Sequence, residues 1–88
     1  MPKYKQVRCG GVRFVFKYDE PDSSLLHIYA RHLTSIDDAL SVFFDPEASE
    51  TWNSERRRFE RYNASHGLFW FWLDEPNQAV MVITCFTL

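Results

Sequence analysis

Hydrophobic residues recur with a period of two near the N-terminal end of the chain. Apolar side chains occupy every second position from residue 12 onward, at Val12, Phe14, Phe16 and Tyr18. This period of two is typical of a strand with one buried face, so we expect a strand over residues 12–18. The glycine pair at 10–11 indicates a bend before this strand, and the polar stretch 19–22 indicates its end.

A short amphipathic helix is expected after the first strand. Apolar residues between Leu25 and Leu33 follow helical spacing, which predicts a helix that runs through His32. Asp22 or Ser23 is placed to cap its N-terminus, because a short side-chain oxygen can accept a hydrogen bond from the first turn.

A second helix is expected from Ser35 onward. Ser35 and Asp38, three residues apart, form a variant of the capping box. The helix should end at Asp45-Pro46, because the residue before a proline is disfavoured in helical conformation. Its apolar face comprises Ile36, Ala39, Leu40 and Phe43.

The second half of the chain reads mainly as strands. Residues 47–54 are polar and predict a loop, whereas 55–64 are compatible with either a helix or a strand. The aromatic run 67–73 and the β-branched run 79–86 flank the turn residues 74–77 and predict a hairpin. We therefore expect one α+β domain over residues 1–88, ordered β-α-α-β-β-β, with both helices on one face of an antiparallel sheet.

Both faces of the predicted hairpin are apolar, which two short helices cannot cover. In its first strand one face carries Phe69, Phe71 and Leu73, and the other carries Trp70 and Trp72. In its second strand one face carries Val80, Val82 and Phe86, and the other carries Met81, Ile83 and Cys85. The uncovered face indicates either a protein interface or a surface for nucleotide stacking. On the first interpretation Trp70 and Trp72 contact a partner, and the chain forms a homo-oligomer.

The charged residues are segregated along the chain, although the net charge is only −2. Residues 1–18 are basic, 19–55 are mostly acidic, and 56–61 hold four arginines. If folding joins the two basic segments, they can bind phosphate; otherwise they are ordinary solvated charges. No apolar run approaches the roughly 20 residues that span a bilayer, and no signal peptide is evident. We expect a cytoplasmic protein without a membrane segment, with Cys9 and Cys85 as reduced thiols.

Residues 31–46, R-H-L-T-S-I-D-D-A-L-S-V-F-F-D-P, carry a likeness to a known family. They resemble the R/K-H-G-V-S-F-E-E-A-x-x-V-F-x-D-P segment of BrnT-like toxins, which are ribonuclease members of the RelE superfamily. The likeness extends to the family's opening F-x-W-D at Phe16–Asp19 and to its closing V-I-T at Val82–Thr84. Leu33 differs, because it stands where the family has glycine. The resemblance favours a strand within residues 55–64.

This resemblance implies an RNA-cleaving toxin that an antitoxin protein neutralises. Such toxins need no metal or cofactor, because the ribose 2′-OH attacks the adjacent phosphate and requires only proton transfer and cationic groups. The catalytic candidates are His27, His32 and Arg61. The candidates for RNA binding are Arg31, Arg57, Arg58 and Tyr62.

Helical spacing separates the roles of the histidines. His27 and Arg31 lie four residues apart on a side of the first helix that is poor in apolar residues. His32 lies beside the apolar stripe, so a structural role is as compatible with the pattern as a catalytic one. His66 lies next to a glycine in a turn and reads as a surface loop residue. The alternative function is a non-catalytic interaction module of the same fold, acting as a homodimer or as a subunit of a larger complex.

Overall fold

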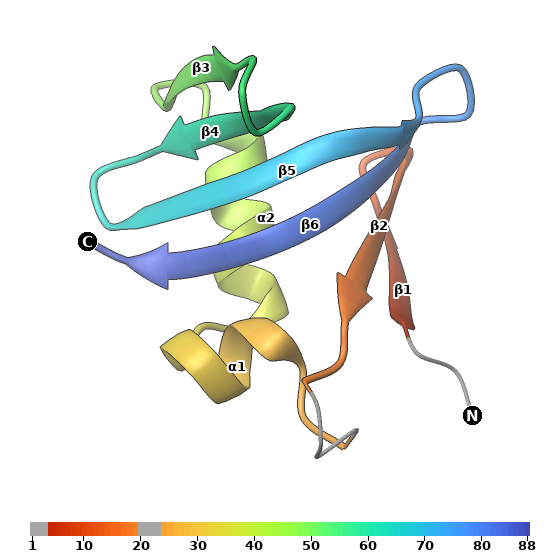
Figure 1. The fold of residues 1–88 in the computed structure, drawn as a ribbon, viewed down its shortest axis with the longest axis vertical. Coiled ribbons are helices and arrows are strands. Elements are labelled where there is room, and N and C mark those ends of the chain that lie inside the picture. The colour runs from red at the N-terminus through yellow and green to blue at the C-terminus, as the bar shows by residue number, and fades with distance from the viewer. Residues whose placement is uncertain (1–3, 20–23) are drawn as a thin grey trace.

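The protein folds into a six-stranded mixed sheet with two helices against one face (Figure 1). A computed structural model describes residues 4–19 and 24–88. The elements are β1 (Tyr4–Cys9), β2 (Val12–Lys17), α1 (His27–His32), α2 (Ile36–Phe44), β3 (Ser49–Asn53), β4 (Arg58–Tyr62), β5 (His66–Asp74) and β6 (Ala79–Thr87). The sheet order is β1-β2-β6-β5-β4-β3. The α+β class, the first predicted strand, both helices and the β5–β6 hairpin are confirmed.

Two strands that the sequence pattern did not predict flank the sheet. β1 pairs with β2 through a turn at Gly10 and Gly11, whose φ angles are 58° and 77°. These positive angles suit a two-residue hairpin turn, so the glycines join two strands rather than mark a simple bend. β3 pairs with β4, and the prediction of a loop over residues 47–54 was therefore wrong for 49–53. The predicted strand within 55–64 is confirmed at β4.

The expectation of a wholly antiparallel sheet was also wrong. β2 and β6 run parallel, with Phe14 opposite Val80 and Phe16 opposite Val82. Parallel neighbours require a long crossover, and here the chain passes through both helices and the β3–β4–β5 meander before it returns as β6. The pairing therefore joins residues more than sixty positions apart, which local patterns do not reveal.

The second helix begins and ends as its capping residues predict. The backbone N–H of Asp38 donates to Ser35 Oγ at 3.1 Å, and the backbone N–H of Ser35 donates to Asp38 Oδ2 at 2.9 Å. The hydrogen bond from the Ser35 backbone lowers the pKa of the Asp38 carboxyl. The helix ends before Pro46, as expected. In α1 the N-cap is Leu26, without a side-chain hydrogen bond; the caps expected at Asp22 or Ser23 lie outside the described residues.

The core lies between the helices and the sheet, and a bulge in β6 determines which residues reach it. Trp70 pairs with Val82 and Phe69 pairs with Thr84, so Ile83 is an extra residue in β6. As a result Cys85 faces the helices together with Val80 and Val82, whereas Phe86 faces away. The predicted faces of β6 were thus wrong beyond Ile83, whereas those of β5 hold as far as Trp72, where a second irregularity makes Leu73 an extra residue. Cys9 and Cys85 are free thiols, and burial raises the pKa of Cys85 to about 11.

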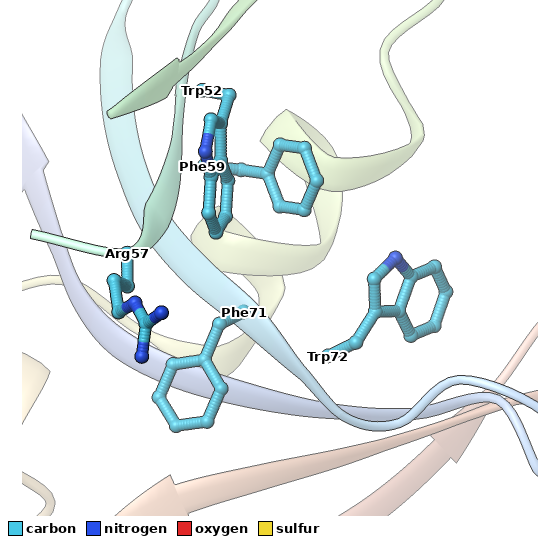
Figure 2. Close-up of a pocket in the computed structure, with 5 residues that line it drawn as sticks. All are labelled: Trp52, Arg57, Phe59, Phe71 and Trp72. Carbon is cyan, nitrogen blue, oxygen red and sulfur yellow. The ribbon is translucent and has the colours of Figure 1, made fainter. Parts of the chain in front are cut away.

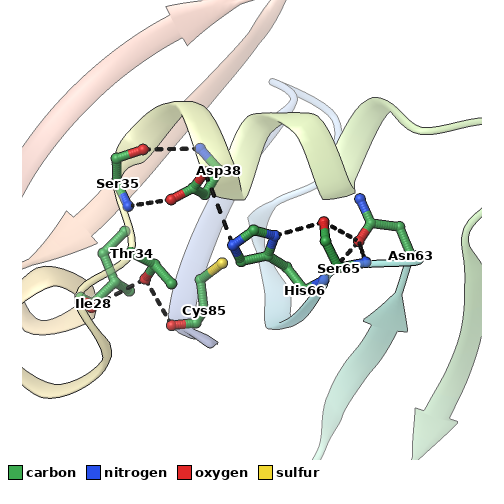
Figure 3. A network of polar contacts seen from close by, with 8 residues as sticks. All are labelled: Ile28, Thr34, Ser35, Asp38, Asn63, Ser65, His66 and Cys85. Carbon is green, nitrogen blue, oxygen red and sulfur yellow. Dashed lines mark hydrogen bonds and ion pairs between the residues drawn. The ribbon is translucent and has the colours of Figure 1, made fainter. Parts of the chain in front are cut away.

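Thr34 fixes the junction between the helices to the sheet (Figure 3). Its hydroxyl oxygen is buried and lies 3.0 Å from the carbonyl oxygen of Ile28 and 2.8 Å from that of Cys85. The backbone N–H of Thr34 donates to the same Ile28 carbonyl. The end of α1 is therefore anchored directly to β6. Neither helix in the described parts of the chain has the length and apolar character needed to cross a membrane.

Candidate nucleic-acid interface

The sheet face turned away from the helices, here called the open face, carries a band of half-buried aromatic rings. The strand register aligns Met81 with Phe71, Thr84 with Phe69, and Phe86 with Gly67. Tyr62 of β4 lies beside Gly67 in the same row. The ring centroids of Phe69 and Phe86 are 5.1 Å apart, and the Tyr62 ring lies 6.2 Å from each of them. Gly67 leaves room for these rings, because a Cβ there would lie 2.5 Å from the Phe86 ring.

The open face is basic although the whole chain is acidic. By the alternation of β1, β2 and β4 these three strands give it four cations, Arg8, Arg13, Lys17 and Arg58, and one carboxylate, Glu60. Arg58 lies over the Phe69 ring, with its Cζ 4.1 Å from the centroid, and is paired with Glu60 at 2.8 Å. The hydrogen bond from Arg58 lowers the pKa of Glu60. Acidic residues gather instead on and just after α2, at Asp37, Asp38, Asp45, Glu47 and Glu50.

A groove of about 330 Å³ opens where the open face meets α1. Its polar lining consists of Tyr4, Lys17 and His27, and its apolar lining comes from Phe71 of β5 and from residues 81–83 of β6. β1 and β2 place Tyr4 opposite Lys17 in their register. His27 enters from α1, the helix that packs near β6. A titratable imidazole, a primary amine and a phenol therefore share one apolar-walled groove.

Asp19 holds the basic residues of α1 in place beside this groove. Its Oδ1 accepts a hydrogen bond from Arg31 Nε at 2.9 Å and lies 3.5 Å from His27 Nδ1. The hydrogen bond from Arg31 lowers the pKa of the Asp19 carboxyl from its ordinary value of 3.8. The four-residue spacing of His27 and Arg31 had predicted a common side of the helix, and their shared partner confirms it.

His32 joins the same cluster from the end of α1. Its ring centroid lies 6.0 Å from that of His27 and 6.0 Å from that of Phe86. His32 is exposed rather than packed in the apolar stripe, and Thr34 makes the buried carbonyl contacts. Three of the predicted site residues, His27, Arg31 and His32, are thus brought together at one end of the open face.

Arg61 lies elsewhere. Its Nε donates to the carbonyl oxygen of Val42 at 2.8 Å and its Nη2 donates to that of Asp45 at 2.7 Å. It also lies 3.5 Å from Glu50. These bonds satisfy carbonyl groups at the C-terminal end of α2, whereas His32 lies before its N-terminal end. The nine residues of α2 rise about 13 Å, so Arg61 and His32 lie near opposite ends of this helix.

The remaining predicted residues are divided between the core and the surface. Trp70 is only 5% exposed, packs against Phe43, and donates from its Nε1 to Glu50 Oε1 at 3.1 Å. Trp70 points to the face of β5 that the helices cover. It therefore belongs to the core of its own chain. Trp72 and Arg57 line a second, separate pocket at the end of β4 (Figure 2).

His66 belongs to a structural network rather than to the groove (Figure 3). Its Nδ1 lies 2.8 Å from Ser65 Oγ, and its Nε2 lies 3.9 Å from Asp38 Oδ1. The contact with Asp38 links the start of β5 to the start of α2, whereas the contact with Ser65 is local to the β4–β5 turn. His66 is half-buried, so the prediction of a simple surface residue missed this link.

Sequence reasoning also missed Tyr4 and Lys17 as members of the groove. Lys17 occupies the polar side of the predicted strand 12–18, which was a usable signal. Tyr4 gave none, because β1 itself was not predicted. Comparison of the chain with protein-family models, with curated proteins and with solved structures gave no match.

Proposed function

We propose that this protein is a toxin-like, metal-independent endoribonuclease that binds single-stranded RNA across its open face. The observation that carries the proposal is the placement of two imidazoles, His27 and His32, at one end of a basic and aromatic sheet surface. The resemblance of residues 31–46 to BrnT-like toxins agrees with this function. It also makes a small antitoxin protein the expected partner.

The open face has the features that single-stranded RNA requires. Unpaired bases stack on accessible aromatic rings with little dependence on sequence, and the half-buried rings of Phe69, Phe86 and Tyr62 supply such a row. Arginine and lysine side chains around them can contact the phosphates. The local excess of positive charge explains how an acidic chain can bind a polyanion.

The proposed reaction is transfer of the phosphoryl group to the neighbouring ribose oxygen. One imidazole takes the proton of the 2′-OH while this oxygen bonds to phosphorus. The bond from phosphorus to the 5′-oxygen breaks, and the other imidazole donates a proton to that oxygen. The products are a 2′,3′-cyclic phosphate and a free 5′-hydroxyl. Lys17 stabilises the negative charge on the phosphoryl oxygens, and Asp19 orients His27.

The test is cleavage of a labelled single-stranded RNA by the purified protein in the presence of EDTA. We expect the wild type to produce 2′,3′-cyclic phosphate ends, and His27→Ala to lower the rate by about a hundredfold or more, the usual contribution of a general acid or base. A DNA strand of the same sequence should bind but stay intact, since it lacks the 2′-OH.

Two further histidine variants show whether the loss of cleavage is specific to the proposed site. His66→Ala removes a histidine outside the groove and should leave cleavage per folded molecule unchanged. His32→Ala should lower the rate as His27→Ala does. If the wild type binds the RNA without cleaving it, the catalytic part of the proposal fails and the protein is an RNA-binding module. If it binds neither the RNA nor the DNA, the whole proposal is overturned.

A further inference from the structure

β5 has a free edge over its last four residues. β4 pairs with β5 only between Gly67 and Trp70, whereas β6 accompanies β5 as far as Asp74. On the β4 side, residues 71–74 therefore have no neighbouring strand in the described parts of the chain. Backbone groups along a free edge can pair with an added strand, and proteins usually protect such edges with charges or covering loops.

A preformed aromatic pocket of about 470 Å³ lies at this free edge (Figure 2). Its walls are Trp52, Phe59, Phe71 and Trp72, with Arg57 at its rim. The ring centroids of Trp52 and Phe59 are 4.8 Å apart. Phe59 and Trp72 both pack against the buried indole of Trp70. The Trp70 ring centroid lies 4.6 Å from that of Phe59 and 5.2 Å from that of Trp72. The pocket is thus built on the core, which reduces the ordering needed when a ligand binds.

The surroundings of the pocket are unusually apolar for an exposed edge. Trp52 is 50% exposed and Leu73 is 49% exposed. Among the residues that line the pocket, Arg57 is the cation, and it lies in a turn where its φ angle is 56°. Its guanidinium makes no ion pair or hydrogen bond within residues 4–19 and 24–88. An apolar pocket beside an unpaired arginine favours a ligand that combines an apolar side chain with a carboxylate.

We propose that this edge docks an extended peptide of a partner protein, which adds as a strand beside residues 71–74 of β5. The backbone of the peptide pairs with β5, an aromatic or large aliphatic side chain enters the pocket, and a nearby Asp or Glu pairs with Arg57. Strand addition of this kind takes its affinity from main-chain hydrogen bonds and its specificity from pockets for alternate side chains. The charge of Arg57 favours this acidic peptide over a second, unmodified copy of the chain, because residues 55–58 would bring further arginines to that interface.

The test is selection of a displayed library of random twelve-residue peptides on the wild-type protein. We expect enriched peptides to contain a large apolar residue within two positions of Asp or Glu. Synthetic versions should slow amide hydrogen exchange at residues 71–74. Arg57→Glu should weaken their binding by about tenfold or more, since it replaces an attractive charge pair by a repulsive one. Exchanging the peptide carboxylate for lysine should restore binding to that variant.

Arg56→Glu is the matched control, because Arg56 lies in the same turn but does not line the pocket. It should bind the selected peptides like the wild type. Trp52→Ala removes one wall of the pocket and should also weaken peptide binding. It provides an independent test in case Arg57→Glu folds poorly. The proposal is overturned if no peptide is enriched, if Arg56→Glu and Arg57→Glu behave alike, or if exchange slows elsewhere. Concentration-dependent dimerisation that protects residues 71–74 would assign the edge to a second copy instead.

Discussion

Leu33 adopts a backbone conformation that side chains with a Cβ rarely tolerate. Its φ and ψ angles are 56° and 28°, in the left-handed region, at the C-terminal cap of α1. Its backbone N–H donates to the Tyr29 carbonyl oxygen at 2.9 Å, which helps to end the helix. The strain at Leu33 lies next to His32 in the proposed site.

Leu33→Gly is expected to stabilise the protein by about 1 kcal/mol. The left-handed conformation costs a residue with a Cβ roughly 1–2 kcal/mol, and the greater freedom of glycine in the unfolded chain offsets part of the gain. Little burial is lost, because Leu33 is 78% exposed. Urea denaturation measures the difference. Leu33→Ala keeps the strain and should match the wild type; equal stability of the glycine and alanine variants would contradict this account.

At the scale of elements, the polar start of α2 links stability to pH. The capping box lowers the pKa of Asp38 because the ionised carboxylate accepts the Ser35 backbone hydrogen bond. A carboxyl whose pKa is lower in the folded state contributes stability above its ordinary pKa, 3.8 here, and loses it as the pH falls through the lowered value. The nearby His66 imidazole favours the ionised carboxylate further.

Asp38→Ala should therefore lower the free energy of unfolding by about 0.5–1 kcal/mol at pH 7, as expected for loss of a helix cap. The difference from the wild type should shrink as the pH falls below 3.8. Thermal unfolding across this range measures it. Asp37→Ala is the control, since Asp37 lies in the same turn outside the capping box. A gap between Asp38→Ala and the wild type that stays constant down to pH 2 would argue against the ionised cap.

The elements that could be predicted are those whose pattern reports burial directly. β2, β5 and β6 carry alternating or continuous apolar residues, and α2 carries both a cap and an apolar face. β1 and β3 are edge strands in which three of six and four of five residues are polar, so neither alternation nor hydrophobicity distinguishes them from loops. The shift of Cys85 into the core depends on a one-residue bulge, which changes the face of every residue beyond it.

In the candidate site, relations between residues close in the sequence could be predicted, whereas those that depend on tertiary packing could not. The pairing of His27 with Arg31 was predictable, because four residues along a helix form a local relation. Arg61 was grouped with them by residue type alone, and its bonds to the carbonyl groups of α2 depend on tertiary packing. Tyr4 and Lys17 reach the groove only because β2 pairs with β6.

For the whole molecule, the decisive property is the separation of charge between its two sides. The open face carries Arg8, Arg13, Lys17 and Arg58, with the Glu60 carboxylate beside Arg58, whereas five acidic residues lie on and just after α2. A net charge of −2 therefore hides a directional field. A polyanion approaching the open face meets an attractive potential, and one approaching α2 is repelled. Binding to RNA should consequently depend strongly on salt.

Charge reversal on opposite faces of the β1–β2 hairpin tests this directly. Arg13→Glu changes the open face, whereas Lys5→Glu changes the other face, because Lys5 pairs with the buried Phe16. With a single-stranded DNA that is bound but not cut, Arg13→Glu should weaken binding and reduce the slope of log affinity against log salt by about one, the effect of losing one phosphate contact. Lys5→Glu adds the same negative charge and should leave the slope unchanged. If the two variants weaken binding equally, total charge rather than the open face governs the interaction, and the nucleic acid binds elsewhere.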